Sequence, residues 1–147
     1  MINSRDIAAL HPIVQAKANH FISGCTLQNL DVIITSTYRD AASQDALYAI
    51  GRTIKGANVR AKKPMGDVVT NAKAGQSFHN FRVAFDFVPI INGKAIWANV
   101  ALFAQCGMIA EACGLEWAGR WTKFTEMAHC QFTGGLTLKD FQEGKTL

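Results

Sequence analysis

Ser77-Phe-His-Asn-Phe-Arg-Val-Ala-Phe-Asp-Phe-Val88 is the stretch of this chain in which a structural and a chemical pattern coincide. From Val83 to Val88 it alternates as a β-strand, with its valine and phenylalanines on one face and Asp86 on the other. His79 and Asp86 are seven positions apart, which is roughly 23 Å along a strand and roughly 10 Å along a helix. Their side chains can meet only if the chain bends, and we expect the bend at Asn80-Phe-Arg82, because Asn tolerates positive φ.

The short string Glu126-Met-Ala-His129 adds the remaining groups of a metal site. His79, Asp86 and His129 together offer two imidazoles and one carboxylate, which are ligands that zinc prefers. A single helical turn would place Glu126 and His129 on one face, about 5 to 6 Å apart at Cβ. Glu126 would then take the proton of a zinc-bound water, whose pKa the metal lowers to about 7. The pattern predicts metal-assisted hydrolysis.

A second segment points toward the same site. Asp31-Val-Ile-Ile-Thr-Ser36 is rich in β-branched residues and predicts a buried strand, which ends just before Tyr38 and Arg39. If Arg39 faces the same cleft, its forked donors would stabilise the oxyanion or hold a substrate carboxylate.

The remaining patterns predict an α+β domain with a small antiparallel sheet and flanking helices. We expect helices over residues 7–21, 41–52 and 100–113, and a capping box at Thr137-Leu-Lys-Asp140 opening a terminal helix. The second helix is expected to bury Leu47. Ile91-Asn-Gly-Lys94 resembles a hairpin turn, residues 128–132 a strand, and residues 115–121 a loop or short strand. Residues 53–76 predict a long surface loop, with residues 67–70 as a candidate strand.

Bulk properties limit the organisation of the chain. At 147 residues it fits one domain, so we expect residues 1–147 to form a single catalytic unit. Apolar residues make up 49% and charged residues 18%, a composition that excludes a disordered protein. The net charge of +4 favours anionic partners only weakly. The basic stretch between residues 55 and 73 is interpreted first as a solvated loop and second as an electrostatic landing site.

The four cysteines form no C-x-x-C pair, so reduced and buried thiols are expected. Cys130 directly follows His129 and would point to the opposite side of an extended segment, which makes it a poor fourth ligand. The N-terminal residues show no basic stretch followed by an apolar run, and no segment approaches eighteen apolar residues. We therefore expect no signal peptide, no stable membrane insertion and synthesis in the cytoplasm.

Simpler structural explanations exist for many of these residues. One histidine with a carboxylate seven positions away is common, and alone it is seldom a metal site. His11 and His20 suit solvent-facing or hydrogen-bonded positions of the first helix. Tyr38, Trp117 and Trp121 are aromatics of the kind that usually lie in a core or at its rim.

Further residues extend the pattern through most of the chain: Thr35-Ser-Thr-Tyr-Arg39, Gln44, Leu47-Tyr48, Gly51-Arg-Thr53, Val69-Thr-Asn-Ala-Lys73, Gln76-Ser-Phe-His-Asn80, Ala84, Asp86, Glu116-Trp117, Gly119, Trp121 and Glu126-Met-Ala-His129. In this order they resemble the L-alanyl-D-glutamate endopeptidases, which are cell-wall lysis enzymes of bacteriophages. These enzymes belong to a zinc peptidase family that also contains D-alanyl-D-alanine carboxypeptidases and dipeptidases. The resemblance implies that His79, Asp86 and His129 bind Zn²⁺ and that Glu126 is the catalytic carboxylate.

The resemblance also implies that Arg39 and Ser77 contact the substrate or the developing negative charge. The implied reaction is hydrolysis of the bond between L-alanine and D-glutamate in peptidoglycan, by an endolysin that lyses its bacterial host. We expect peptidoglycan as the partner, no nucleic acid, and a monomer. The enzyme would act at the cell wall or in the periplasm after a separate phage protein has permeabilised the membrane.

Three features of the sequence depart from the family pattern. Arg82 stands where the family usually has Gly, so either the bend needs no positive φ there or its geometry differs, and the side chain could line the cleft. Glu126 stands where close relatives often have Asp. The loop over residues 53–68 is longer and more basic than usual, which weakly favours contact with anionic wall material.

Two alternatives remain open from sequence. The first is a D-alanyl-D-alanine carboxypeptidase of the same family, which the Tyr-Arg and Gly-Arg-Thr contexts disfavour. The second is a non-catalytic domain that binds the cell wall or nucleic acid through its basic surface. Such a domain has no need for both Glu126 and a complete ligand trio.

Overall fold

The sheet forms around its longest strand, β2 (Ala84–Ile91), in a computed structural model that describes residues 1–147. Its strand order is β1-β2-β5-β4, in which β1 (Asp31–Ser36), β5 (His129–Gln131) and β4 (Glu116–Trp117) follow one another through antiparallel pairs. A short β3 (Lys94–Ala95) pairs with the far end of β2. The predicted α+β class with an antiparallel sheet is confirmed.

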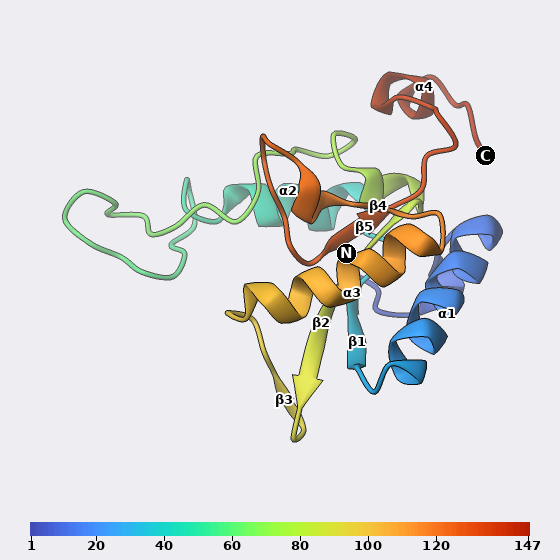
Figure 1. Cartoon of the computed structure of the whole chain (residues 1–147). Helices are drawn as coiled ribbons and strands as arrows, with labels where there is room; N and C mark the ends of the chain where they lie inside the picture. The colour runs from blue at the N-terminus through green and yellow to red at the C-terminus, as the bar shows by residue number, and fades with distance from the viewer.

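Two helices cover one face of this sheet. α1 (Pro12–Leu27) contacts β1, and α3 (Val100–Ala112) contacts β2. The two helices also contact each other (Figure 1). Phe21 of α1 lies 5.8 Å from Phe85 and 5.0 Å from Phe87, and Phe103 of α3 lies 5.5 Å from Phe87, measured between ring centroids. Because β2 alternates, burying these phenylalanines under the helices turns Asp86 to the opposite face. That face forms the floor of a cleft.

The first predicted helix is wrong at both ends. Residues 7–9 form a 3₁₀ turn, η1 (Ile7–Ala9), and α1 begins only at Pro12 and continues to Leu27. Pro at the first helical position lacks only an N–H that has no helical partner. His11 caps this end, because its Nδ1 accepts a hydrogen bond from the Ile13 amide.

Two predictions of burial were also wrong. β1 is an edge strand rather than a buried one, and its Ile33 is 45% exposed. α2 (Ala41–Ala49) ends three residues early and buries Ser43 and Gln44, whereas Leu47 is half-buried at the cleft. A helix beside a polar cleft buries polar side chains when they find partners there.

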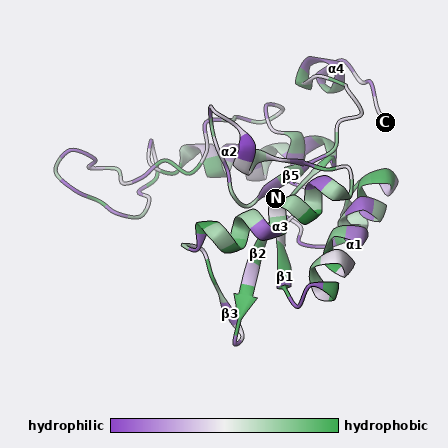
Figure 2. Ribbon diagram, in the orientation of Figure 1, coloured by the Kyte–Doolittle hydropathy of each residue, from purple (hydrophilic) through white to green (hydrophobic).

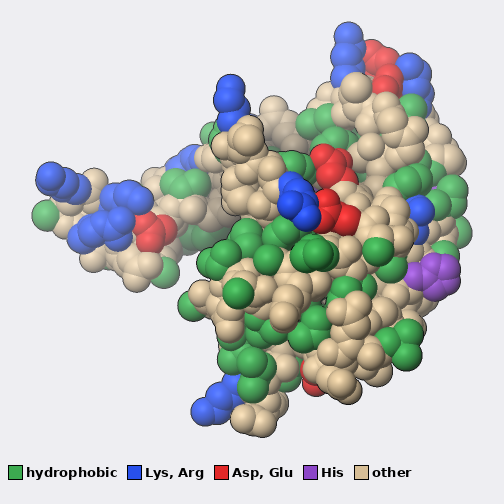
Figure 3. Space-filling model, viewed as in Figure 1, with side chains coloured by type: hydrophobic (Ala, Val, Ile, Leu, Met, Phe, Trp, Pro, Cys, Tyr) green, Lys and Arg blue, Asp and Glu red, His purple; other side chains and the backbone are tan.

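The long surface loop is confirmed, and its candidate strand at residues 67–70 does not form. Its middle part, residues 54–68, projects from the body of the protein as an arm (Figure 1). Figure 3 shows several basic side chains on the surface of this arm. Asp67 accepts hydrogen bonds from Asn58 at 2.8 Å and Lys63 at 3.0 Å, which lower its pKa to about 2. Arg60 also pairs with it at 3.2 Å, so one acid holds the arm together.

The remaining local predictions hold. Asn92 and Gly93 make the hairpin turn with φ values of 52° and 76°, and α3 ends before Gly114 at φ 82°. The capping box at Thr137 and Asp140 opens α4 (Leu138–Gln142). Figure 2 shows apolar residues along β1 and the outer part of β2, with polar residues on the arm.

All four cysteines are free, and Cys130 packs in the core on the side of its strand opposite to the cleft. Trp117 is also a core residue, confined between Gly107 and Gly119, where any Cβ would overlap its indole. No helix combines the length and apolarity that crossing a bilayer requires.

Candidate metal centre and active-site cleft

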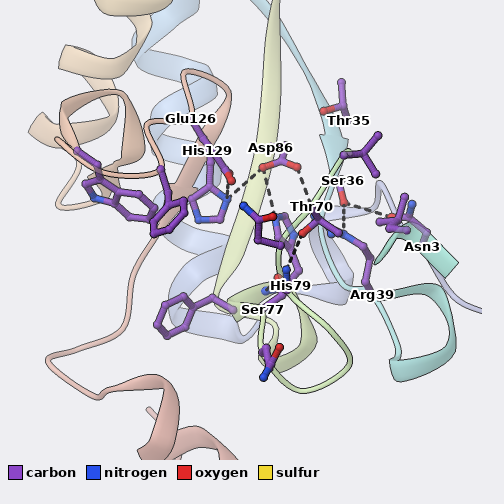
Figure 4. A pocket seen from close by; sticks show the side chains of 18 residues that line it. Asn3, Thr35, Ser36, Arg39, Thr70, Ser77, His79, Asp86, Glu126 and His129 are labelled. Carbon is purple, nitrogen blue, oxygen red and sulfur yellow. Dashed lines mark hydrogen bonds and ion pairs between the residues drawn. The ribbon is translucent and has the colours of Figure 1, made fainter. Parts of the chain in front are cut away.

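Three elements bring the predicted ligand residues together. Asp86 of β2 lies directly opposite His129 of β5 in the antiparallel register, and η2 (Phe78–Phe81) supplies His79. Asp86 Oδ1 lies 3.2 Å from His79 Nε2 and 3.2 Å from His129 Nδ1. The three ligand atoms all lie within 4.8 Å of one another (Figure 4).

The predicted bend between His79 and Asp86 exists, but the residue with positive φ is Arg82 rather than Asn80. Arg82 adopts φ 64° and ψ 24° at the end of η2. Its guanidinium stacks 3.8 Å from the Tyr38 ring centroid and donates to Ala9 O at 2.8 Å, away from the cleft. Of the two alternatives considered for Arg82, the one in which the bend needs no positive φ there is therefore wrong, and its side chain does not line the cleft.

Asn80 stabilises the bend through its side chain instead. Its Oδ1 accepts from the Gly75 amide at 3.1 Å and the Ser77 amide at 3.3 Å, and its Nδ2 donates to Arg39 O at 2.9 Å. Asn80 thus links the residues before the turn to the segment that carries Arg39.

Hydrogen bonds behind each imidazole fix which ring nitrogen faces Asp86 as an acceptor. His79 Nδ1 lies 2.7 Å from the Thr37 carbonyl, which only accepts, so this nitrogen carries the hydrogen. His129 Nε2 lies 2.8 Å from Gln131 Oε1. Gln131 Nε2 donates to Glu116 Oε2 at 3.1 Å, which orients the amide so that His129 Nε2 is also the protonated nitrogen.

In these tautomers three acceptor atoms point at one another without a hydrogen between them. Such an arrangement repels unless a cation lies between the atoms. Two ligands at zinc-binding distance from one tetrahedral ion lie about 3.3 Å apart, close to the observed 3.2 Å. The donor set of His79, Asp86 and His129 therefore fits zinc.

Burial and charge shift the ionisation of these residues in different directions. Burial raises the pKa of Asp86, but the nearby imidazoles of His79 and His129 outweigh it and hold that pKa well below its usual range. Burial lowers the pKa of His79 despite Asp86. Burial also acts to lower the pKa of His129. The hydrogen bond to Asp86 and the negative charge of Asp86 outweigh burial, so the pKa of His129 is raised. The carboxylate is therefore ionised and ready to bind a cation.

Arg39 lies in the cleft beside the second oxygen of Asp86, as predicted. Its Nη2 is 3.5 Å from Asp86 Oδ2, its Nε donates to Ser36 Oγ at 3.2 Å, and its Nη1 donates to Gln44 Oε1 at 3.0 Å. Gln44 in turn donates to Ala72 O at 2.8 Å. Only 9% of Arg39 is exposed, and burial lowers its pKa against the opposing charges of Asp86 and Glu126.

Glu126 lies beside His129, but no helical turn places it there. A reverse turn in which the His129 amide donates to Glu126 O at 3.3 Å brings its Oε2 to 3.7 Å from His129 Nδ1. Its side chain is 60% exposed and lines the cleft. The expected proximity is confirmed, whereas the expected helical turn is wrong.

Ser77 also lines the cleft, at the start of η2. Its Oγ accepts a hydrogen bond from the His79 amide at 3.3 Å and so caps the turn that carries this histidine. The cleft has a volume of about 780 Å³, and Asn3, Thr70, Asn71, Trp121 and Phe124 also line it.

Sequence reasoning missed the residues behind the ligands. Gln131 follows His129 by two positions, so strand alternation placed both on one face and was a usable signal. Thr37 acts through its backbone carbonyl, which no residue type reveals. Gln44 and Glu116 were part of the family pattern, but their partners became clear only in three dimensions.

Comparisons with known proteins agree with this geometry. A family model described as D-alanyl-D-alanine carboxypeptidase matches residues 70–132. The peptidoglycan L-alanyl-D-glutamate endopeptidase CwlK of Bacillus subtilis (strain 168) is 34% identical over 137 residues, covering 83% of this chain and 72% of the relative.

Solved structures share the fold. The L-Ala D-Glu endopeptidase ChiX of Serratia marcescens superposes with a TM-score of 0.61 at 19% identity, over 95% of this chain and 92% of its own. The vancomycin resistance D,D-pentapeptidase VanY, solved in complex with Zn(II), gives a TM-score of 0.63 at 14% identity, over 90% and 83%. The chain therefore belongs to the metallopeptidase family that contains the D-alanyl-D-alanine carboxypeptidases and the CwlK endopeptidase.

Proposed function

We propose that this protein is a zinc-dependent endopeptidase that hydrolyses the L-alanyl-D-glutamate bond of peptidoglycan stem peptides. The observation that carries the proposal is the convergence of three acceptor atoms, from the buried His79 and His129 and the half-buried Asp86, beside the exposed carboxylate of Glu126. The 34% identity to CwlK supports the choice of scissile bond.

The residues around the trio suit hydrolysis of an amide. His79, Asp86 and His129 would hold the zinc ion, which would supply Lewis-acid activation of the attacking water and of the peptide carbonyl. Glu126 is held by the turn next to His129 and accepts the proton of the attacking water. The same carboxyl group then returns a proton to the leaving amine of D-glutamate, which restores Glu126 for the next cycle.

Arg39 and Ser77 complete the proposed site. The buried guanidinium of Arg39 faces the cleft from the side opposite to Glu126, with Asp86 between them (Figure 4). From there it stabilises the charge that develops on the carbonyl oxygen or holds a substrate carboxylate. The hydroxyl of Ser77 lines the cleft at the start of η2 and donates to the same substrate.

We also propose a biological setting, which rests on the motif resemblance to bacteriophage endopeptidases. In this setting the enzyme is an endolysin, made in the host cytoplasm, that reaches the wall after another protein has permeabilised the membrane. Expression in a bacterial host with and without a membrane-permeabilising protein tests it. Lysis only when both proteins are present supports an endolysin, and lysis by the enzyme alone contradicts this route.

The activity is tested by incubating the zinc-loaded protein with purified peptidoglycan and identifying the new amino termini. New D-glutamate amino termini are expected. Release of terminal D-alanine instead would assign the carboxypeptidase activity described for the matching family model. Binding to peptidoglycan without cleavage of any bond would indicate the non-catalytic alternative.

A further inference from the structure

The two ends of the cleft differ in chemistry. One end is polar and cationic, with the guanidinium of Arg39 among Ser36, Asn3 and Thr70. The other end, beyond Glu126 and His129, carries the aromatic side chains of Trp121 and Phe124. Figure 4 shows Asp86 between these ends, with Arg39 on one side and Glu126 on the other.

Phe124 is placed at the cleft at a conformational cost. It adopts φ 54°, which is rare for a bulky residue, and it is 74% exposed. The fold therefore gains little burial from a side chain whose backbone is strained. Strain of this kind, kept in a cleft, is a reason to look for a ligand contact.

Trp121 is held rigidly on the same segment. Its indole Nε1 donates to Glu116 Oε1 at 2.9 Å, and its ring lies 5.7 Å from the His129 ring between centroids. Glu116 Oε2 accepts from Gln131, which orients His129. The same carboxylate thus fixes the aromatic end of the cleft and one predicted zinc ligand.

We propose that Trp121 and Phe124 form a subsite for the sugar ring of the muramyl residue that carries the stem peptide. This inference rests on the proposed function and names the part of peptidoglycan that the aromatic end binds. The faces of aromatic rings are electron-rich, so they attract the C–H bonds that line one face of a pyranose. The exposed Phe124 beside the half-buried Trp121 therefore suits a neutral sugar better than a charged peptide.

The asymmetry of the substrate matches that of the cleft. In peptidoglycan the amino group of L-alanine is acylated by the lactyl group of the muramyl residue. The sugar therefore lies about two residue lengths, roughly 7 Å, from the scissile carbonyl. Phe124 and Trp121 line the same cleft as Glu126, so a substrate with its scissile carbonyl beside Glu126 can extend its sugar to this aromatic end. On the other side of the bond, D-glutamate carries a free α-carboxylate, which suits Arg39.

Paired substrates test the subsite. One is N-acetylglucosaminyl-N-acetylmuramyl-L-alanyl-D-glutamate, and the other is N-acetyl-L-alanyl-D-glutamate, which lacks both sugars. The quantity compared is kcat/KM for the disaccharide substrate divided by kcat/KM for the sugar-free substrate. We expect Phe124→Ala to lower this ratio about tenfold, and Phe124→Tyr, which keeps the ring, to preserve it. Trp97→Ala is the matched control, because Trp97 is 59% exposed and lies outside the cleft. An unchanged ratio in Phe124→Ala would overturn the subsite.

A binding measurement keeps the inference separable from the proposed function. Saturation-transfer NMR with the uncleavable probe N-acetylglucosaminyl-N-acetylmuramyl-L-alanine reports which sugar protons contact the protein. We expect transfer to the muramyl ring protons in the wild-type protein, and its loss in Phe124→Ala. Absence of transfer in the wild-type protein would overturn the subsite. Transfer without hydrolysis of either paired substrate would reject the proposed function and keep the subsite.

Discussion

The floor and the rim of the cleft are built in opposite ways. On the floor, His79 and His129 are 2% and 7% exposed, and each has a buried hydrogen-bond partner behind it. On the rim, Glu126 and Phe124 lie in a segment without helix or strand and are mostly exposed. Residues of the floor therefore affect metal binding and packing together, whereas residues of the rim affect catalysis with little effect on stability.

Asp86→Asn breaks the floor and has the largest expected effect. Asparagine keeps the shape but removes the charge that binds the cation between His79 and His129. Zinc content measured by plasma emission spectrometry should fall from one per chain toward zero, and hydrolysis should fall by roughly 10³-fold or more. The wild-type protein treated with a chelator is the control and should match this variant. Full zinc content in Asp86→Asn would contradict the ligand assignment.

Glu126→Gln changes the rim without touching the floor. Because the side chain is 60% exposed, zinc content and the midpoint of thermal unfolding should stay as in the wild-type protein. Hydrolysis should fall by about 10²- to 10⁴-fold, since glutamine cannot accept the proton. Glu143→Gln, an exposed carboxylate that does not line the cleft, serves as the matched control. Undiminished turnover in Glu126→Gln would rule out its role as the base.

Gln131→Leu tests the layer behind the floor. Leucine has a similar volume but removes both the acceptor for His129 and the donor to Glu116. Loss of such an orienting partner usually lowers metal affinity by about 10- to 100-fold, which competition with a chromophoric chelator measures. Gln15→Leu, which removes a hydrogen bond to Leu10 O far from the cleft, should leave zinc affinity unchanged. Equal affinities in both variants would show that Gln131 does not orient the ligand.

The floor was largely predictable from sequence, and the rim was not. Alternation along residues 83–88 separated Asp86 from the phenylalanines, because one buried face fixes the register of a strand. Residue chemistry suggested grouping Asp86 with His79 and His129, and the family resemblance was needed to favour that grouping over simpler structural explanations. Glu126 lies beside His129 as predicted, although the predicted helical turn does not form. A reverse turn and a helical turn bring residues three positions apart to similar distances.

What sequence could not supply came from partners far along the chain. The Thr37 carbonyl meets His79 across 42 positions, and a backbone acceptor leaves no trace in residue type. α2 buries Gln44 rather than Leu47 because Arg39 and Ala72 O satisfy the amide. Hydrophobic patterning assumes an apolar interior, so it fails where a helix borders a polar site.

Substitutions of Arg82 compare the cost of its strained backbone with the stabilisation by its side-chain contacts. They have the smallest expected effect. Its φ of 64° costs about 1–2 kcal/mol for a residue with a Cβ. The stack on Tyr38 and the hydrogen bond to Ala9 O offset that cost by about 1–2 kcal/mol together. Arg82→Gly should therefore change the free energy of unfolding by less than about 1 kcal/mol, because it removes strain and contacts at once.

Arg82→Ala completes this comparison, because alanine loses the contacts and keeps the strain. Its free energy of unfolding in urea should lie about 1 kcal/mol below that of Arg82→Gly. Equal stability of the two variants would mean that the backbone relaxes out of the left-handed region once the arginine is gone. The contacts of Arg82 with Tyr38 and Ala9, rather than the path of the chain from His79 to Asp86, would then impose the positive φ.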